Sequence, residues 1–224
     1  MTTKNDEQKK SLADKVSAVL QKNRLVFLSV ISVFLVAIIA VSVIFAITES
    51  TNKKTFESID KIVYSLSQAP EDSLDAEKEK ALSELQQIAE KNKKGAVAVR
   101  TYLSIADIQY SNQNWEEAIN AWKSAANADP KSYTAAICYY NIASCYEELA
   151  DINSALSFYE KVLTDDDCVF ITRTLFDLGR VNENLGDFTK AAEYYNRLTA
   201  DYASDAWATL AESRLISLKI DGKI

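Results

Sequence analysis

Residues 25–47, LVFLSVISVFLVAIIAVSVIFAI, are the feature that most constrains this chain, because they contain no charged residue, glycine or proline. An α-helix rises about 1.5 Å per residue, so this stretch reaches about 34 Å, slightly more than the roughly 30 Å of a bilayer's hydrocarbon core. A helix also satisfies its own backbone hydrogen bonds, as the membrane interior requires. The stretch therefore predicts a single transmembrane helix near the N-terminus.

The charges on either side of this stretch predict its orientation. Residues 1–24 carry a net charge of +3, and the rest of the chain carries −10. Because the flank rich in Lys and Arg tends to remain in the cytoplasm, we expect the N-terminus inside and the C-terminal domain outside. A cleaved signal peptide is the alternative. The apolar run is longer than such peptides use, and Ala46 has Ile44, not a small residue, two positions before it, so we favour a retained anchor.

Composition excludes several functions for the part after the membrane. An acidic domain does not suit nucleic acid, whose phosphates require a basic footprint. The chain has no histidine, which removes histidine-based acid–base catalysis and histidine metal ligands. We find no nucleophile with a base at helpful spacing, no glycine-rich phosphate loop and no metal-ligand cluster. The sequence thus predicts no enzyme, no cofactor, no metal and no small-molecule substrate.

Beyond residue 50 the apolar residues recur with helical spacing, and only two prolines and four glycines interrupt the whole chain. We expect a helix over 51–67, a loop over 68–73 and a helix over 74–93, with Gly95 at the C-terminal cap of the latter. A final helix over 206–219, capped by Ser204 and Asp205, is expected to close the domain. The fold class is all-α.

The helical region repeats itself. Ala81, Ala118, Ala155 and Ala191 recur at intervals of 37, 37 and 36 residues, with a large side chain four positions after each and an apolar residue seven positions after each. A second recurrence precedes the last three: Ala106, Ala143 and Gly179 end three similar segments. Small residues at two facing positions are what a closely packed helix pair needs, so the pattern predicts stacked helix pairs with turns at 112–114, 150–151 and 186–187.

The segments YNIASCYEELADINSALSFYEKVL and LGRVNENLGDFTKAAEYYNRL resemble tetratricopeptide repeats, which are helix-turn-helix units of about 34 residues. The resemblance implies an α-solenoid that binds proteins. The apolar stretch and the charges predict a cytoplasmic basic head (1–24) and a transmembrane helix (25–47). The repeat pattern adds a membrane-proximal helical pair forming a degenerate repeat (48–98), three repeats (99–203), and a capping helix with a tail (204–224).

The layout of basic head, single span and acidic repeat domain is similar to YfgM-like ancillary subunits of the bacterial SecYEG translocon. DYASDAWATLAESRL also looks like repeats of Tol-Pal-associated cell division coordinators and of outer-membrane assembly lipoproteins. These resemblances imply a single-pass inner-membrane protein with a periplasmic domain, whose partners are translocon subunits, periplasmic chaperones or exported chains. An envelope scaffold for division or outer-membrane assembly, and a cytosol-facing import receptor, remain as alternatives.

Tetratricopeptide arrays bind partners on the surface lined by the first helix of each repeat. The resemblance places a protein-binding groove with aromatic shelves and mixed charge there. The alternative is that Tyr140 and Phe176 pack against neighbouring helices. The family's carboxylate clamp is not expected, since Asp107 and Asp177 would repel its ligand. The groove candidates are Arg100, Leu103, Asp107, Tyr110, Tyr140, Ser144, Glu147, Arg173, Phe176, Asp177 and Arg180.

Three cysteines and a run of aspartates need separate interpretations. Cys138 and Cys145 lie seven residues apart on one predicted helix, about 10.5 Å along its axis, which is too far for a disulfide. We expect both in the core and Cys168, near a loop, as the exposed thiol. Residues 165–167 are consecutive aspartates, which do not match the spaced ligands of a calcium loop and are expected to form a solvated turn.

Overall fold

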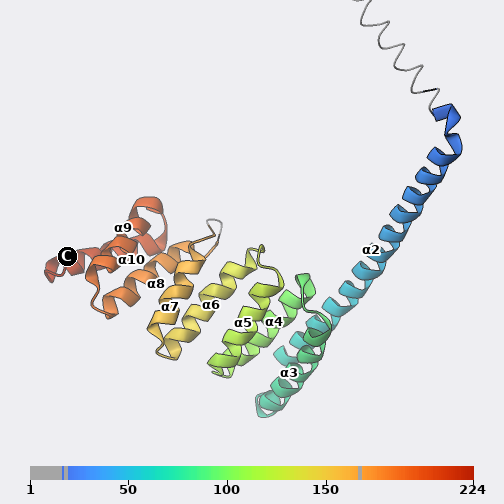
Figure 1. The fold of residues 1–224 in the computed structure, drawn as a ribbon. Coiled ribbons are helices and arrows are strands. Elements are labelled where there is room, and N and C mark those ends of the chain that lie inside the picture. Colours follow the sequence, from blue (N-terminus) through green and yellow to red (C-terminus); the bar gives the residue numbers. More distant parts are fainter. Residues whose placement is uncertain (1–16, 18–19, 166–167) are drawn as a thin grey trace, which may run out of the picture. The chain divides into compact units, whose positions relative to one another are not determined.

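The computed structural model describes residues 17, 20–165 and 168–224, which are helical without any strand (Figure 1). Most of the basic head and Asp166–Asp167 of the aspartate turn therefore lie outside the described residues. The elements, in order, are α2 (Arg24–Ser67), a 3₁₀ turn η1 (Glu71–Ser73), α3 (Leu74–Lys91), α4 (Gly95–Ser111), α5 (Trp115–Ala128), α6 (Thr134–Glu148), α7 (Ile152–Val162), α8 (Ile171–Asn184), α9 (Phe188–Asp201) and α10 (Ala206–Ile220).

The chain divides into two compact units, with the boundary between Lys54 and Thr55. In the first unit, the apolar side chains of residues 25–47 are exposed. The hydroxyl groups of Ser29, Ser32 and Ser42 each donate to a carbonyl of the preceding turn. This helix is long and apolar enough to cross a membrane, a property that an N-terminal signal sequence shares.

The sequence predicts a transmembrane helix over 25–47 and a further helix over 51–67, and in the structure α2 runs through both ranges, from Arg24 to Ser67, without a break. No glycine or proline lies between residues 47 and 54, and the hydroxyl of Thr48 donates to the carbonyl of Ile44 within the helix. Nothing in this segment ends a helix.

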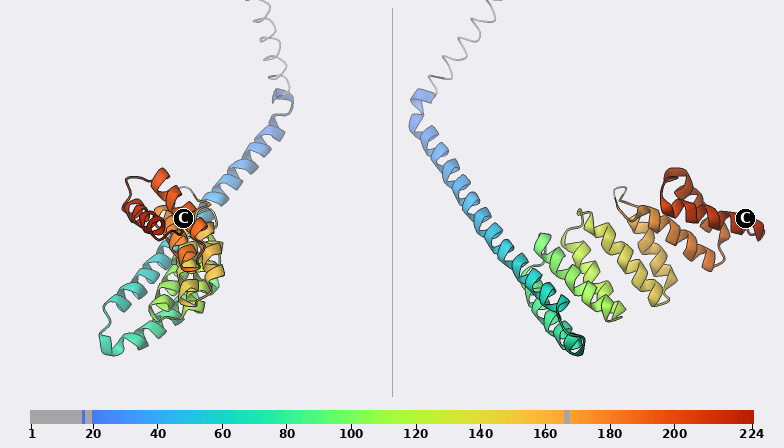
Figure 2. Two further views of the ribbon diagram at one scale, coloured as in Figure 1. Left: turned by 90° about the vertical axis from the view of Figure 1, so that its left-hand side faces the viewer. Right: turned by 180° about the vertical axis from the view of Figure 1, so that it is seen from behind.

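In the second unit the helices form successive antiparallel pairs, which Figure 2 shows from two further sides. Helices α4, α6 and α8 are the first helices of their pairs, α5, α7 and α9 are the second helices, and α10 follows as a single first helix. The predicted crossing residues are all buried, which confirms the register: Ala106, Ala118, Ala143, Ala155, Gly179 and Ala191.

The turns within the pairs lie where the sequence predicts them. Gln113, Ala150 and Gly186 adopt the left-handed backbone conformation that reverses the chain after a helix. The side chains of Asp151 and Asp187 then accept hydrogen bonds from backbone N–H groups and cap α7 and α9. These caps fix where each second helix begins.

Two predicted helix ends differ from the structure. Gly95 has a φ of 77° and is the first residue of α4, whereas α3 already ends at Lys91, so Gly95 is not the cap of the preceding helix. At the last helix, the side chain of Asp205 accepts from the N–H of Trp207, and Ser204 takes no part in the cap.

Cys138 and Cys145 are buried and unpaired, as predicted, but Cys168 is also buried, so its predicted exposure is wrong. Its N–H donates to the carbonyl of Asp165, and the side chain packs in the same core cluster as Ile171. The position near a loop predicted exposure, but the Cys168 side chain packs into the core.

We expect alkaline pH to destabilise the repeat domain through the two core thiols. Burial, with a smaller effect of Asp107 or Glu148, raises the pKa of Cys138 and of Cys145 to about 12, against about 8.5 in an unfolded chain. The stabilising contribution is therefore complete below pH 8.5 and is lost as the pH rises toward 12. Urea unfolding of the full chain in detergent at pH 8 and pH 10 should show a loss of about 2 kcal/mol per thiol.

A Cys138→Ala/Cys145→Ala variant is the control for this pH dependence. It lacks both thiols, so its free energy of unfolding should fall less between pH 8 and pH 10 than that of the parent. An equal fall in both proteins would assign the pH dependence to other groups, such as the buried tyrosines.

Candidate protein-docking face

Side chains of α8 contact α6 on one side and α10 on the other, and we call the surface formed by the first helices α4, α6, α8 and α10 the first-helix face. Every predicted groove residue lies on α4, α6 or α8. The structure places them differently with respect to solvent. Arg100, Asp107, Tyr110 and Arg173 are exposed, whereas Tyr140 and Asp177 are buried and the others are partly buried.

Four of the predicted residues form one polar network between α6 and α8. The Tyr140 hydroxyl donates to Asp177 Oδ2 at 2.8 Å. The Arg180 guanidinium donates to Glu147 Oε1 at 2.8 Å and to Asp177 Oδ1 at 3.2 Å. Burial raises the pKa of Asp177, while the Tyr140 hydroxyl and Arg180 act in the opposite direction. The two carboxylates are thus already paired within the chain.

A glutamate that links three helices recurs in the next repeat. Glu147 accepts from the hydroxyl of Tyr159 on α7, at 2.7 Å, as well as from Arg180 on α8. Thirty-six residues later, Glu183 accepts from the hydroxyl of Tyr195 on α9, at 3.2 Å, and pairs with Arg214 on α10. Sequence reasoning missed Glu183 and Arg214. The periodicity of the tyrosines and glutamates was the available signal.

Arg173 connects α8 to its neighbours through its guanidinium. Its guanidinium carbon lies 5.2 Å from the ring centre of Tyr140 and 5.6 Å from that of Trp207 on α10. Phe176 stacks obliquely on Trp207, with ring centres 5.2 Å apart. These cation–π and aromatic contacts hold the last helix against the third repeat.

The N-terminal part of the first-helix face, on α4, is more exposed to solvent. Arg100 pairs with Asp60 at 3.2 Å, and both side chains are at least half exposed. Tyr110 packs its ring against Trp115 and Trp122, with ring centres 5.0 and 5.5 Å apart, and remains 39% exposed. Within the described residues, the indole N–H of Trp122 has no acceptor.

This difference follows from the register. Tyr110 occupies the position that Glu147 and Glu183 hold in the later repeats, and Trp122 occupies that of Tyr159 and Tyr195. A tyrosine ring therefore replaces the carboxylate that the later repeats use to join their helices. The result is an aromatic surface at the first repeat and a hydrogen-bonded polar surface at the second and third.

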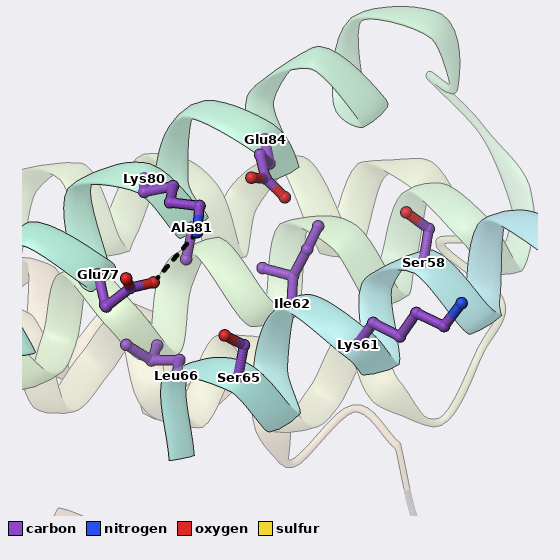
Figure 3. Close-up of a pocket in the computed structure, with 9 residues that line it drawn as sticks. All are labelled: Ser58, Lys61, Ile62, Ser65, Leu66, Glu77, Lys80, Ala81 and Glu84. Atoms are coloured by element: carbon purple, nitrogen blue, oxygen red, sulfur yellow. Dashed lines mark hydrogen bonds and ion pairs between the residues drawn. The ribbon is translucent and has the colours of Figure 1, made fainter. Parts of the chain in front are cut away.

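A shallow groove also lies between the C-terminal part of α2 and α3 (Figure 3). It has a volume of about 250 Å³, and Ile62, Leu66 and Ala81 supply its apolar lining. Lys80 and Glu77 form an ion pair at its edge, at 3.4 Å. None of the predicted groove residues lines it, and its mixed, open walls provide no convergent set of polar groups.

Comparisons with known proteins agree with this geometry. Residues 97–167 and residues 173–205 each match a family model described as tetratricopeptide repeat. A TPR repeat-containing protein of Treponema pallidum (strain Nichols) is 30% identical over 118 residues, which is 53% of this chain and 49% of that protein. This chain thus spans about half the length of that relative.

A tetratricopeptide repeat protein from Parabacteroides merdae ATCC 43184 has a similar solved structure. The TM-score is 0.56 at 19% sequence identity, covering 74% of this chain and 61% of that one, a likeness of fold. Residues 97–167 and 173–205 of this chain are therefore tetratricopeptide repeats, which form an α-solenoid of the kind that acts as a protein–protein interaction module.

Proposed function

We propose that this chain is a membrane-anchored docking protein whose first-helix face binds other proteins. The observation that carries the proposal is that one chain combines tetratricopeptide repeats with an apolar helix whose side chains over residues 25–47 are exposed. Exposed apolar surface of this extent requires a nonpolar environment. Anchoring raises the local concentration of whatever the repeats bind at the membrane surface.

The domain order supports a more specific role. A basic head on one side, a single span, and an acidic repeat domain on the other suit an inner-membrane protein with its repeats in the periplasm. We propose that it is an accessory factor of protein export, with translocon subunits, periplasmic chaperones or exported chains as partners. The resemblance to YfgM-like translocon subunits supports this assignment. In this proposal the chain consists of a cytoplasmic head (1–24), the membrane span (25–47), a membrane-proximal helical pair (48–98), three repeats (99–203) and a capping helix with a tail (204–224).

Within the first-helix face, the exposed groups are those that a partner reaches. They are the half-exposed guanidinium groups of Arg100 and Arg173, the carboxylate of Asp107 and the ring of Tyr110. Tyr and Arg are side chains that often dominate binding energy at interfaces. Tyr140 and Asp177 contribute differently, because they hold α6 against α8 and set the spacing of the exposed groups.

A photo-crosslinking experiment tests this proposal. p-Benzoylphenylalanine in place of Tyr110 should trap partner proteins in intact cells, and the same amino acid in place of Tyr133 should not. Tyr133 is the matched control, because it is also a tyrosine, lies in the turn before α6 and is more exposed, at 69%. Equal trapping at both positions would contradict docking on the first-helix face.

The compartment of the trapped proteins tests the orientation in the same experiment. Exported or periplasmic proteins are the expected products. Division or outer-membrane assembly proteins would favour the envelope scaffold. Cytosolic proteins alone would reverse the orientation and leave a receptor for targeted chains as the function.

A further inference from the structure

The second helices α3, α5, α7 and α9 form the other side of the repeat stack, and we call it the second-helix face. Between α5 and α7 an aromatic ring occupies the place beside Lys161, while an open groove of about 430 Å³ remains nearer Asp151, at the start of α7. Phe158 of α7 lies 5.6 Å from the ring centre of Tyr146 and 6.2 Å from that of Tyr139, both on α6. The ammonium groups of Lys123 and Lys161 lie 5.4 and 4.1 Å from the Phe158 ring centre.

The next repeat has an aromatic residue at the same position. Tyr194 of α9 stands 36 residues after Phe158, the interval that separates Ala155 from Ala191. Its hydroxyl donates to Glu160 Oε1 of α7 at 3.3 Å, so the ring bridges α7 and α9. Two consecutive pairs of second helices, α5 with α7 and α7 with α9, therefore have an aromatic side chain between them that the later helix contributes.

The preceding repeat lacks this ring. The position 37 residues before Phe158 is Ala121, and an open groove of about 380 Å³ lies between α3 and α5 around it. Tyr102, the counterpart of Tyr139, is still present in the lining. Gln86 and Ser124 line this groove at the positions that Lys123 and Lys161 hold beside Phe158. The groove thus keeps an aromatic wall but lacks both the ring and the two cations.

The chemistry of the lining indicates what fits. Ala89, Ile105 and Ala121 are buried and form an apolar floor. The ionised side chains around it are Glu90, Glu117 and Lys93, which give the groove a net charge of −1. An apolar floor beside an aromatic wall favours another aromatic ring, and the carboxylates favour a positive charge next to that ring.

We propose that the groove between α3 and α5 binds an aromatic side chain, Phe or Tyr, that has a Lys or Arg beside it in a protein partner. The partner supplies the ring and the cation that Phe158, Lys123 and Lys161 supply within the chain one repeat later. This docking site lies on the second-helix face, so it is separate from the first-helix face and does not depend on docking there.

Disulfide exchange at a cysteine placed next to the groove tests the proposal in the full chain in detergent. Ser124→Cys puts a thiol in the groove lining, and the native cysteines are buried. The probes are mixed disulfides of cysteamine acylated with 3-phenylpropionate or with acetate, equilibrated against 2-mercaptoethanol and measured by intact mass. The phenyl probe should be retained at about tenfold higher 2-mercaptoethanol than the acetyl probe, because it buries its ring.

The matched control is Lys161→Cys, the equivalent position beside the place that Phe158 already occupies. It should retain the phenyl and acetyl probes equally. Ala121→Phe in the Ser124→Cys background should place a ring in the α3–α5 groove, at the position equivalent to Phe158, and abolish the preference for the phenyl probe. At Ser124→Cys, a phenyl probe that carries an ammonium group should be retained at a higher 2-mercaptoethanol concentration than one that carries a carboxylate.

No phenyl preference at Ser124→Cys, or an equal preference at Lys161→Cys, would overturn the aromatic site, and a preference for the carboxylate probe would overturn the cationic neighbour. If Ala121→Phe does not fold, the comparison of the two cysteine positions still decides the question. Crosslinking through Tyr110 is independent of all these results, so the first-helix proposal can fail while this one stands.

Discussion

Replacing Gly179 with valine is expected to lower the free energy of unfolding of the repeat domain by about 3 kcal/mol, the upper part of the range for overpacked cores. A Cβ atom at this position would lie 2.4 Å from Tyr195 Cε1 and 2.6 Å from its Cδ1. The Tyr195 ring is fully buried and cannot move outward without breaking its hydrogen bond to Glu183. Either α8 and α9 separate or the ring leaves its site.

Urea unfolding of the full chain, followed by far-ultraviolet circular dichroism, measures the effect. Ala200→Val is the matched control, because Ala200 is an exposed helical residue of α9 and the change should stay within about 0.5 kcal/mol. In a Tyr195→Leu background, Gly179→Val should lower the free energy of unfolding clearly less than it does in the parent, because the ring with which the valine collides is absent. A Gly179→Val protein as stable as its parent would mean that α8 and α9 do not cross at this glycine.

Replacing Asp177 with alanine is expected to cost about 3 kcal/mol, because it leaves a buried hydroxyl and a partly buried guanidinium without their acceptor. The Tyr140 hydroxyl loses its acceptor at 2.8 Å, and Arg180 keeps only Glu147. The Asp177 side chain is 11% exposed, so water does not readily replace it. Asp60→Ala is the control, since the Asp60–Arg100 pair is exposed and should contribute less than about 1 kcal/mol.

A double-mutant cycle with Tyr140→Phe isolates the hydrogen bond. Once the hydroxyl is absent, Asp177→Ala should cost about 1 kcal/mol less than in the parent, because one buried polar group no longer lacks a partner. Additive costs would show that the two side chains act independently. If Asp177→Ala lowered the free energy of unfolding no more than Asp60→Ala does, the α6–α8 network would contribute no more to stability than an exposed ion pair.

The repeat architecture was predictable from the sequence because it rests on local periodicity. Small residues at Ala106, Ala143 and Gly179, and at their facing positions, identify where two helices approach each other, and the structure confirms those crossings. The turns were predictable for the same reason, since Asp151 and Asp187 are N-cap residues next to a chain reversal. Such signals depend on a few neighbouring residues.

Helix ends with weaker signals were predicted less well. Gly95 carries the positive φ that glycine tolerates, but it opens α4 instead of closing α3. The ranges 25–47 and 51–67 were predicted as two helices, but they form the single helix α2, because polarity by itself does not end a helix when every residue accepts helical dihedral angles. Its position near a loop likewise suggested exposure of Cys168, whose side chain is in fact part of the core.

The sequence by itself determined that this chain has an apolar N-terminal helix and stacked helix pairs with a definite register, because both follow from hydrophobic spacing along the chain. Only the tertiary structure decided which polar residues remain available for binding. Tyr140 and Asp177 lie 37 residues apart and meet because α6 and α8 are neighbours. The open groove around Ala121 likewise follows only from the arrangement of α3, α4 and α5 in space. Contacts between helices depend on how the helices cross and not on sequence spacing alone.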